Sequence, residues 1–288
     1  MRQTKGEKIF EVFNVIIMCL LALVTLYPMI NVLAVSLSRN DYVVRGEVTF
    51  YPIGFTLKAY NYLFKFSTIL DGYRNTLFLV IVGTALNLFF TAMTAYALSK
   101  RDLIGRNLFL FLIVFTMMFG GGMIPNYLLV KDLHLINSLW SLILPGTISA
   151  YNLIIMKNFF QAIPRELIES SRIDGLSEMG ILFRMVIPLS LPALTTIGLF
   201  YAVGHWNSFF DAIIYINNKK KWPLQLILRD ILFFADTQQA LTDDISTNIP
   251  LEPLKMATVI GTTLPVLVFY PFIQKYFVKG VMIGSVKG

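Results

Sequence analysis

The chain has 288 residues, of which 56% are hydrophobic and 14% are charged, and its mean hydropathy is +0.67. A soluble domain carries about 25% charged residues, so this composition excludes an ordinary soluble protein and favours one whose surface faces lipid. The net charge of +7 comes from basic residues at the ends of apolar runs. They form no stripe with interleaved aromatic residues, which argues against nucleic acid as a partner.

Six apolar runs are long enough to cross a bilayer, which takes about 20 residues of helix. They cover residues 12–37, 75–98, 108–130, 139–160, 191–216 and 253–278. The sequence therefore predicts an all-α membrane protein in which residues 1–288 form a single transmembrane domain. Prolines such as Pro125 and Pro145 lie inside these runs. Because neighbouring helices or water can satisfy the freed carbonyls, we expect kinks there and not breaks.

The orientation follows from basic residues in short loops, which mark the cytoplasmic side of a membrane. The very short loop after the second run contains Lys100, Arg101 and Arg106. Lys219 to Lys221 favour the opposite orientation, but they begin a long loop, residues 217–252, where the rule is weaker. We therefore predict that both termini and residues 161–190 are cytoplasmic, and that residues 217–252 form an external loop.

The segment after Ile163 has the features of a short helix. Pro164 suits a first helical position, and Glu166 and Glu169 lie near the positive end of the helix dipole. Gly175 can end the helix in a left-handed conformation. A helix of about ten residues is not stable alone in water, so it must pack on another surface.

One side of this helix combines small and acceptor residues. Helical periodicity gathers Leu167, Ser170, Ser171 and Asp174 there. The small serines let another backbone approach closely, so the helix could receive force from a soluble partner. The alternative is an interfacial helix that lies on lipid headgroups, and the residues alone leave both open.

The loop also resembles a known family. Glu169-Ser170-Ser171, then Asp174-Gly175 and a final Pro188, resemble the Glu-Ala-Ala loop of ATP-binding-cassette (ABC) importer permeases, with serines in place of the alanines and Ile187 in place of a leucine. Residues 119–125 and 276–284 are similar to the LplC and MalG branch of carbohydrate permeases.

The resemblance implies a MetI-like permease fold in the bacterial inner membrane, with the loop helix seated in a groove of an ATPase subunit. The residues implied in this coupling are Glu166, Glu169, Ser170, Ser171, Asp174, Gly175 and Pro188. The implied partners are a second related permease, two ATPase subunits and an extracytoplasmic sugar-binding protein. Residues 279–288 would reach the ATPase pair, and the binding protein would contact residues 217–252. The implied cargo is an oligosaccharide. We expect an acidic oligosaccharide, derived from alginate or pectin.

The chain itself has no features of an enzyme. It lacks the Gly-x-x-x-x-Gly-Lys-Ser/Thr phosphate cradle, so ATP and Mg are expected in the partner ATPase. The two histidines, His134 and His205, are far apart and lack cysteine or acidic companions at ligand spacing. We therefore expect no metal site and no cofactor in this chain.

Polar residues in the fifth run form a second candidate site. His205, Trp206, Asn207 and Asp211 lie where polar groups are costly and usually face a cavity or a bundle interior. One interpretation is that they line the translocation path, with Trp206 offering a flat face to a sugar ring. The alternative is that they lie near the outer end of the span and satisfy one another.

A self-contained secondary transporter is the alternative function. It predicts ion-binding carboxylates at the membrane midplane and inverted repeats. Only Asp211 lies clearly within a span, and no repeat is visible. Dependence of uptake on a proton gradient would favour this alternative, and dependence on a separate ATPase would favour the importer.

Overall fold

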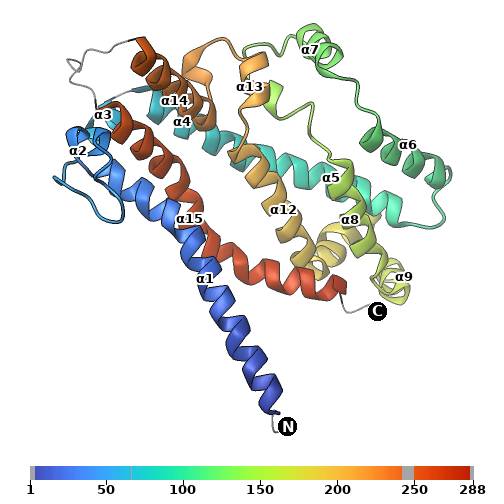
Figure 1. The fold of residues 1–288 in the computed structure, drawn as a ribbon. Helices are drawn as coiled ribbons and strands as arrows, with labels where there is room; N and C mark the ends of the chain where they lie inside the picture. Colours follow the sequence, from blue (N-terminus) through green and yellow to red (C-terminus); the bar gives the residue numbers. More distant parts are fainter. Residues whose placement is uncertain (1–3, 66, 242–249, 286–288) are drawn as a thin grey trace. The chain divides into compact units, whose positions relative to one another are not determined.

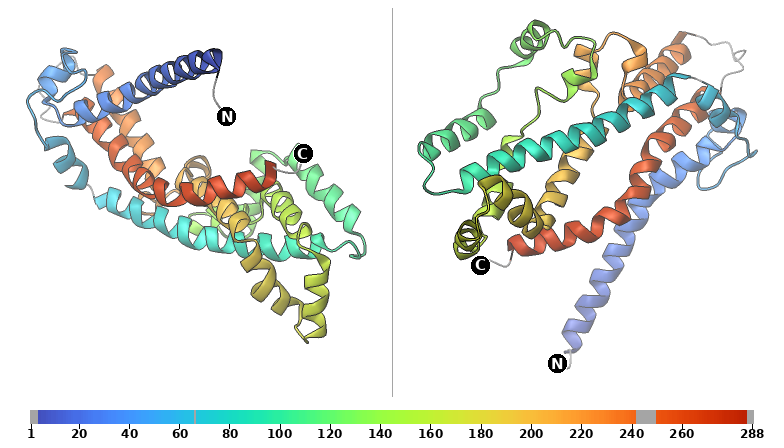
Figure 2. Two further views of the ribbon diagram at one scale, coloured as in Figure 1. Left: turned by 90° about the horizontal axis from the view of Figure 1, so that it is seen from below. Right: turned by 180° about the vertical axis from the view of Figure 1, so that it is seen from behind.

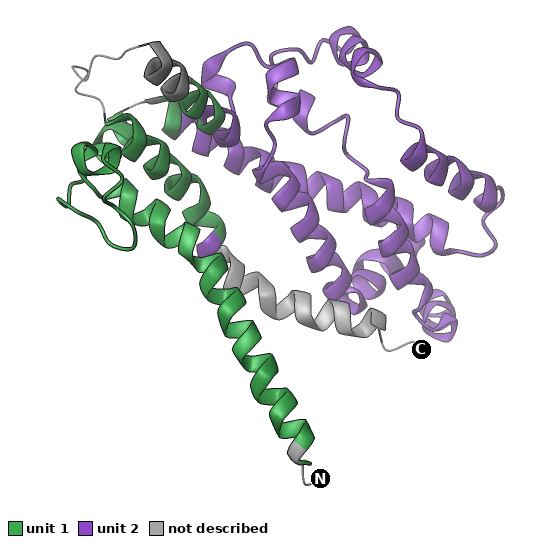
Figure 3. Ribbon diagram, viewed as in Figure 1, with its two compact units in different colours: residues 1–69, 228–266 green, residues 70–227, 267–288 purple. Residues whose placement is uncertain are grey.

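The computed structural model describes residues 4–65, 67–241 and 250–285, and every regular element in these ranges is a helix (Figure 1). The predicted all-α class is therefore confirmed. The chain divides into two compact units (Figure 3). The first comprises residues 1–69 and 228–266, and the second comprises residues 70–227 and 267–288.

The first unit contains α1 (Lys5–Ser36), which covers most of the first predicted span. Thr4 begins this helix with a capping box, because its hydroxyl accepts the Glu7 amide and its own amide donates to the Glu7 carboxylate. Near the other end of the helix, Val35 and Val48 share one buried cluster. Most apolar side chains along α1 are exposed, as expected of a helix that faces lipid.

The second predicted span is one continuous helical path. α4 (Ser67–Phe78), η1 (Leu79–Gly83) and α5 (Thr84–Ser99) follow one another without a break. The helix thus begins earlier than the predicted residue 75. η1 is a π-helical turn, a feature that often occurs at functional sites.

The third predicted span is broken, not kinked. α6 (Arg106–Met118) and α7 (Met123–Asp132) meet at 115°. Gly122, directly before α7, has a φ of +83°, which glycine adopts without steric cost. The expectation of a kink at Pro125 was wrong because the glycine run ends the helix first. Pro125 then lies in the first turn of α7, where its missing amide costs little.

The fourth predicted span is helical only in part. A short 3-10 turn, η2 (Leu139–Leu142), is followed by an irregular segment that contains Pro145, and α8 (Ala150–Gln161) begins after it. The predicted kink at Pro145 is thus also a break. Asn87 of α5 donates its side-chain amide to two carbonyls of the irregular segment, so a neighbouring helix supplies hydrogen bonds that the break removes.

The fifth predicted span consists of two helices, α12 (Leu191–Trp206) and α13 (Phe210–Tyr215), joined by a short link. The sixth is covered by α15 (Leu251–Ser285), and Pro265 and Pro271 lie inside this helix without ending it. The expectation that prolines do not break the spans is confirmed here and in the first span, where Pro28 lies inside α1.

The segment between the first two predicted spans and the predicted external loop both contain helices. Residues 38–74 include α2 (Asn40–Val44), α3 (Lys58–Lys65) and part of α4, and residues 217–252 include η4 (Lys219–Lys221) and α14 (Leu224–Leu241). Parts of two predicted partner contacts lie outside the described residues, namely residues 242–249 of the loop and residues 286–288 of the tail.

Within the described residues, three helical stretches are long and apolar enough to cross a membrane: Gly6–Ser36, Thr68–Ser99 and Leu251–Val268. Two pairs of bent helices raise the number to five if each pair counts as one span. The count of six spans and the cytoplasmic position of both termini stay predictions.

The core of the second unit lies where α5, α8 and α12 pack side by side (Figure 1). Ala95 of α5, Met156 of α8 and Ile197 of α12 are completely buried in it. The segment that follows α8 packs on one end of this core, through residues such as Ile168 and Leu182. The core thereby gives the candidate coupling loop a rigid support.

Candidate functional site

The predicted loop helix is confirmed as α9 (Arg165–Ile173), which lies past the end of α8 (Figure 2). Pro164 occupies the N-cap, one position before the expected one. Gly175 has a φ of +81°, so the predicted left-handed end is confirmed. The amides of Gly175 and Leu176 donate to carbonyls in the last turn of α9 at 3.0 and 3.1 Å. These two bonds form a Schellman motif, which fixes where α9 ends.

Three short elements follow α9 and lead into the next span. They are α10 (Glu178–Ile181), η3 (Leu182–Val186) and α11 (Ile187–Leu189). Pro188 lies in the first turn of α11, where its missing amide hydrogen costs little. The helical path then bends by 86° into α12.

The outer face of α9 differs from the prediction in one residue. Ser171 is only 8% exposed, and its hydroxyl donates to the Leu167 carbonyl at 2.8 Å and to Met185 Sδ at 3.1 Å. It therefore anchors the helix and is not available to a partner. The other predicted residues of α9 and its C-cap are exposed: Glu166, Leu167, Glu169, Ser170 and Asp174. Ile173, which the sequence interpretation missed, is 87% exposed.

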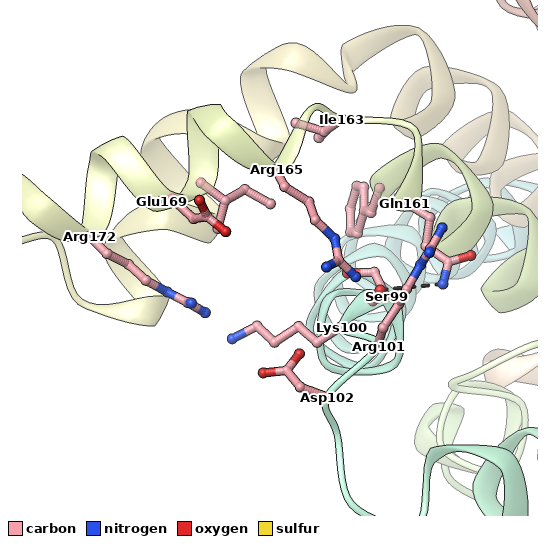
Figure 4. A pocket seen from close by; sticks show the side chains of 11 residues that line it. Ser99, Lys100, Arg101, Asp102, Gln161, Ile163, Arg165, Glu169 and Arg172 are labelled. Atoms are coloured by element: carbon pink, nitrogen blue, oxygen red, sulfur yellow. Dashed lines mark hydrogen bonds between the residues drawn. The ribbon is translucent and has the colours of Figure 1, made fainter.

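A groove of about 800 Å³ runs beside α9 (Figure 4). One wall comes from the end of α5 and the turn after it, and the other from the end of α8 and from α9. Its charged residues are Lys100, Arg101, Asp102, Arg165, Glu169 and Arg172. Cations outnumber carboxylates among them, so the groove suits an acidic group of a partner better than a basic one.

Glu178 ties the parts of this site together, although the sequence interpretation did not single it out. Its Oε1 accepts a hydrogen bond from Arg172 Nη2 at 2.8 Å, and its Oε2 accepts one from the Tyr96 hydroxyl at 2.7 Å and pairs with Lys100. The hydrogen bond from Lys100 is the main cause that lowers the pKa of Glu178 to about 2. Glu178 is therefore ionised at any pH at which a cell functions.

A second polar cluster joins three elements inside the second unit. Asn87 is 1% exposed, and its Nδ2 donates to the carbonyls of Gly146 and Thr147 at 3.1 and 2.7 Å. Its Oδ1 accepts a hydrogen bond from His205 Nε2 at 2.7 Å. A side chain at Gly83, in η1, would overlap the His205 ring, because a Cβ there would lie 2.5 Å from Nε2. Glycine at this position thus allows the ring to reach Asn87.

The structure separates the predicted residues of the translocation path. His205 and Trp206 end α12, Asn207 follows as its C-cap, and Asp211 lies in the first turn of α13. His205 has its partner on α5 and not among its predicted companions. Asn207 and Asp211 are exposed in the isolated chain. Their role in transport stays a prediction.

Comparison with known proteins gives one consistent result. Residues 103–283 match the model of the family described as binding-protein-dependent transport system inner membrane component. The protein LplC of Bacillus subtilis is 46% identical over 100% of this chain and 98% of its own length. The polygalacturonan/rhamnogalacturonan transport system permease protein YtcP of the same species is 45% identical over 98% of this chain and 99% of its own length.

A solved structure agrees with these relatives. A chain from the crystal structure of a bacterial ABC transporter involved in the import of the acidic polysaccharide alginate matches with a TM-score of 0.88 and 32% identity. The match covers 96% of this chain and 99% of that one. The chain therefore belongs to the family of binding-protein-dependent inner membrane transport components, with a MetI-like fold, and is an ABC transporter permease subunit that works with an ATPase and a substrate-binding protein.

Proposed function

We propose that this chain is one of two related permease subunits that, with two ATPase subunits, import acidic oligosaccharides. The observation that carries this proposal is full-length similarity, at 45% identity, to a permease named for polygalacturonan and rhamnogalacturonan transport. The similarity to a chain from an alginate importer supports the same class of cargo. All three named polysaccharides are acidic, so a negatively charged sugar chain is the common feature.

In this proposal, α9 is the coupling helix. Its exposed Glu166, Glu169 and Ser170, together with Asp174 at its C-cap, contact the ATPase. Gly175 and Pro188 hold the turns that connect α9 to the spans. The partner ATPase binds ATP and Mg. This chain converts the movement of that subunit into alternating access and performs no covalent chemistry.

The predicted external loop contacts the binding protein and its cargo in the same proposal. Its η4 turn carries three consecutive lysines, Lys219–Lys221, which suit an acidic sugar or an acidic binding protein equally well. Lys255, which follows this loop in the sequence, is 7% exposed and pairs with Glu252 at 2.7 Å, so it presents no exposed charge to a partner. His205, Trp206, Asn207 and Asp211 are proposed as contacts along the path, of which His205 also holds α12 on α5.

Reconstituted transport tests the proposal. The chain is co-expressed with its genomic neighbours, purified through a tag on this chain and placed in proteoliposomes with the binding protein. We expect uptake of oligogalacturonides or oligoalginates that requires ATP on the ATPase side, and little uptake of neutral maltooligosaccharides. Uptake of neutral sugars alone would contradict the acidic cargo. Uptake driven by an ion gradient without the ATPase would contradict the importer assignment itself.

A further inference from the structure

We infer that Glu178 is a positioning residue that transmits movement of the coupling helix α9 to the membrane helix α5. The inference rests on the proposed role of α9. It concerns a different question, namely how a short helix outside the spans displaces a long helix inside them.

The first observation is that few side chains anchor α9 to the rest of the unit. Ser171 is buried and Ile168 is half-buried, but the rest of the helix is exposed. Nine residues of helix have little stability of their own. An anchor of two side chains, Ile168 and Ser171, would let α9 tilt without moving its support, so efficient coupling requires a further connection.

The second observation is that Glu178 supplies this connection. Arg172, in the last turn of α9, donates to one carboxylate oxygen, and Tyr96 and Lys100, at the end of α5, bind the other. The Schellman turn at Gly175 reverses the chain and brings Glu178 back beside Arg172, six residues earlier. One carboxylate thus links the end of α9 to the end of α5.

The third observation is that the α5 side of the link is rigid. Tyr96 is 6% exposed and belongs to the core that α5, α8 and α12 share. The Lys100 ammonium also lies 4.7 Å from the centre of the Tyr96 ring, which adds a cation–π contact. A pull on Glu178 therefore acts on the core and not on a mobile surface side chain.

The coupling ratio, ATP hydrolysed per sugar imported, tests this inference in the full complex. Glu178→Gln keeps an acceptor for Tyr96 and removes the charge that Arg172 and Lys100 bind. We expect the ratio to rise about fivefold, which is the lower end of typical coupling effects. Arg172→Ala should raise it similarly, and the double variant should raise it little more, because both changes break one link.

A matched control is Glu47→Gln, which removes a carboxylate paired with Arg45 in the first unit, at 3.9 Å. It should leave the ratio unchanged. If Glu178→Gln leaves the ratio at the wild-type value, the inference is wrong. This holds even if the yield of complex falls, or if the rates of ATP hydrolysis and sugar import fall in parallel. The variant Gly175→Val distinguishes a failure of the Glu178 link from a failure of the proposed coupling role of α9. If Gly175→Val uncouples and Glu178→Gln does not, only the link fails; if neither uncouples, the assignment of α9 fails.

Discussion

Replacing Gly175 with valine is expected to abolish most sugar import while ATP hydrolysis by the partner continues. The φ of +81° at this residue costs a side-chain-bearing residue about 1–2 kcal/mol, and a β-branched one is disfavoured further. The chain would relax by abandoning the Schellman turn, which would reorient the end of α9. We expect import to fall about tenfold or more, which corresponds to roughly 1.4 kcal/mol of lost coupling. Transport and ATPase assays on the same proteoliposomes measure both rates.

Gly46→Val is the matched control for this prediction. Gly46 has a φ of +72° in a turn of the first unit, so valine brings the same kind of backbone strain far from α9 in the sequence. Its import rate per complex should stay close to that of the wild type.

Glu169→Ala should resemble Gly175→Val, since both alter the proposed coupling helix without altering the spans. Normal import in both Gly175→Val and Glu169→Ala would contradict the coupling role of α9.

Replacing Asn87 with leucine is expected to lower the stability of the chain by about 2 kcal/mol. Three partners would lose their hydrogen bonds at once: two carbonyls in the break before α8 and the His205 ring. Individual side-chain hydrogen bonds between membrane helices average only about 0.6 kcal/mol, so the sum over three partners gives the larger effect. Thermal unfolding in detergent, monitored as the loss of monodisperse complex, measures this change in stability.

Thr195→Val is the control for Asn87→Leu. The Thr195 hydroxyl donates only to carbonyls of its own helix, at 2.9 Å to Leu191 and 3.0 Å to Pro192, and the side chain is exposed. This change should alter stability by less than about 0.5 kcal/mol. If Asn87→Leu and Thr195→Val unfold at the same temperature, other contacts hold the break before α8.

Local patterns in the sequence predicted the loop helix well. The proline, the acidic first turn and the glycine end all lie in the short stretch from Pro164 to Gly175, and α9 and the left-handed Gly175 agree with them. The family resemblance extended this prediction to the MetI-like fold. The resemblance extends that far because the spacing of the motif depends on how the loop packs, and related chains share this packing.

The sequence did not predict contacts between distant residues. Glu178 and Tyr96 are 82 residues apart, and His205 and Asn87 are 118 residues apart. No periodicity or spacing reveals such pairs. Ser171 was expected on the outer face because helical phase alone does not show which side of a short helix meets the core. The sequence analysis used the polar residues of the fifth apolar run as a signal but overlooked the same signal at Asn87 in the second run.

The break at Pro145 in the fourth span has the same explanation. A proline in a membrane helix produces a kink when the helix continues beyond it and a break when other groups satisfy the freed backbone. At Pro145 the groups that do so are Asn87 and the Tyr201 hydroxyl, which accepts the Ser149 amide at 3.0 Å. Both lie on other helices, so the outcome depends on tertiary packing and not on the run itself.

The central claim is that the outer face of α9 contacts the ATPase, and site-directed cross-linking tests it most directly. Cys19 is the single cysteine, so Cys19→Ser gives a background in which one new cysteine can be placed. Ser170 and Ser171 are adjacent and chemically identical, but only Ser170 is exposed. We predict that Ser170→Cys forms a cross-link to the ATPase with a short thiol-to-amine reagent and that Ser171→Cys does not. Absence of a cross-link from Ser170→Cys in the intact, ATP-hydrolysing complex would contradict the account.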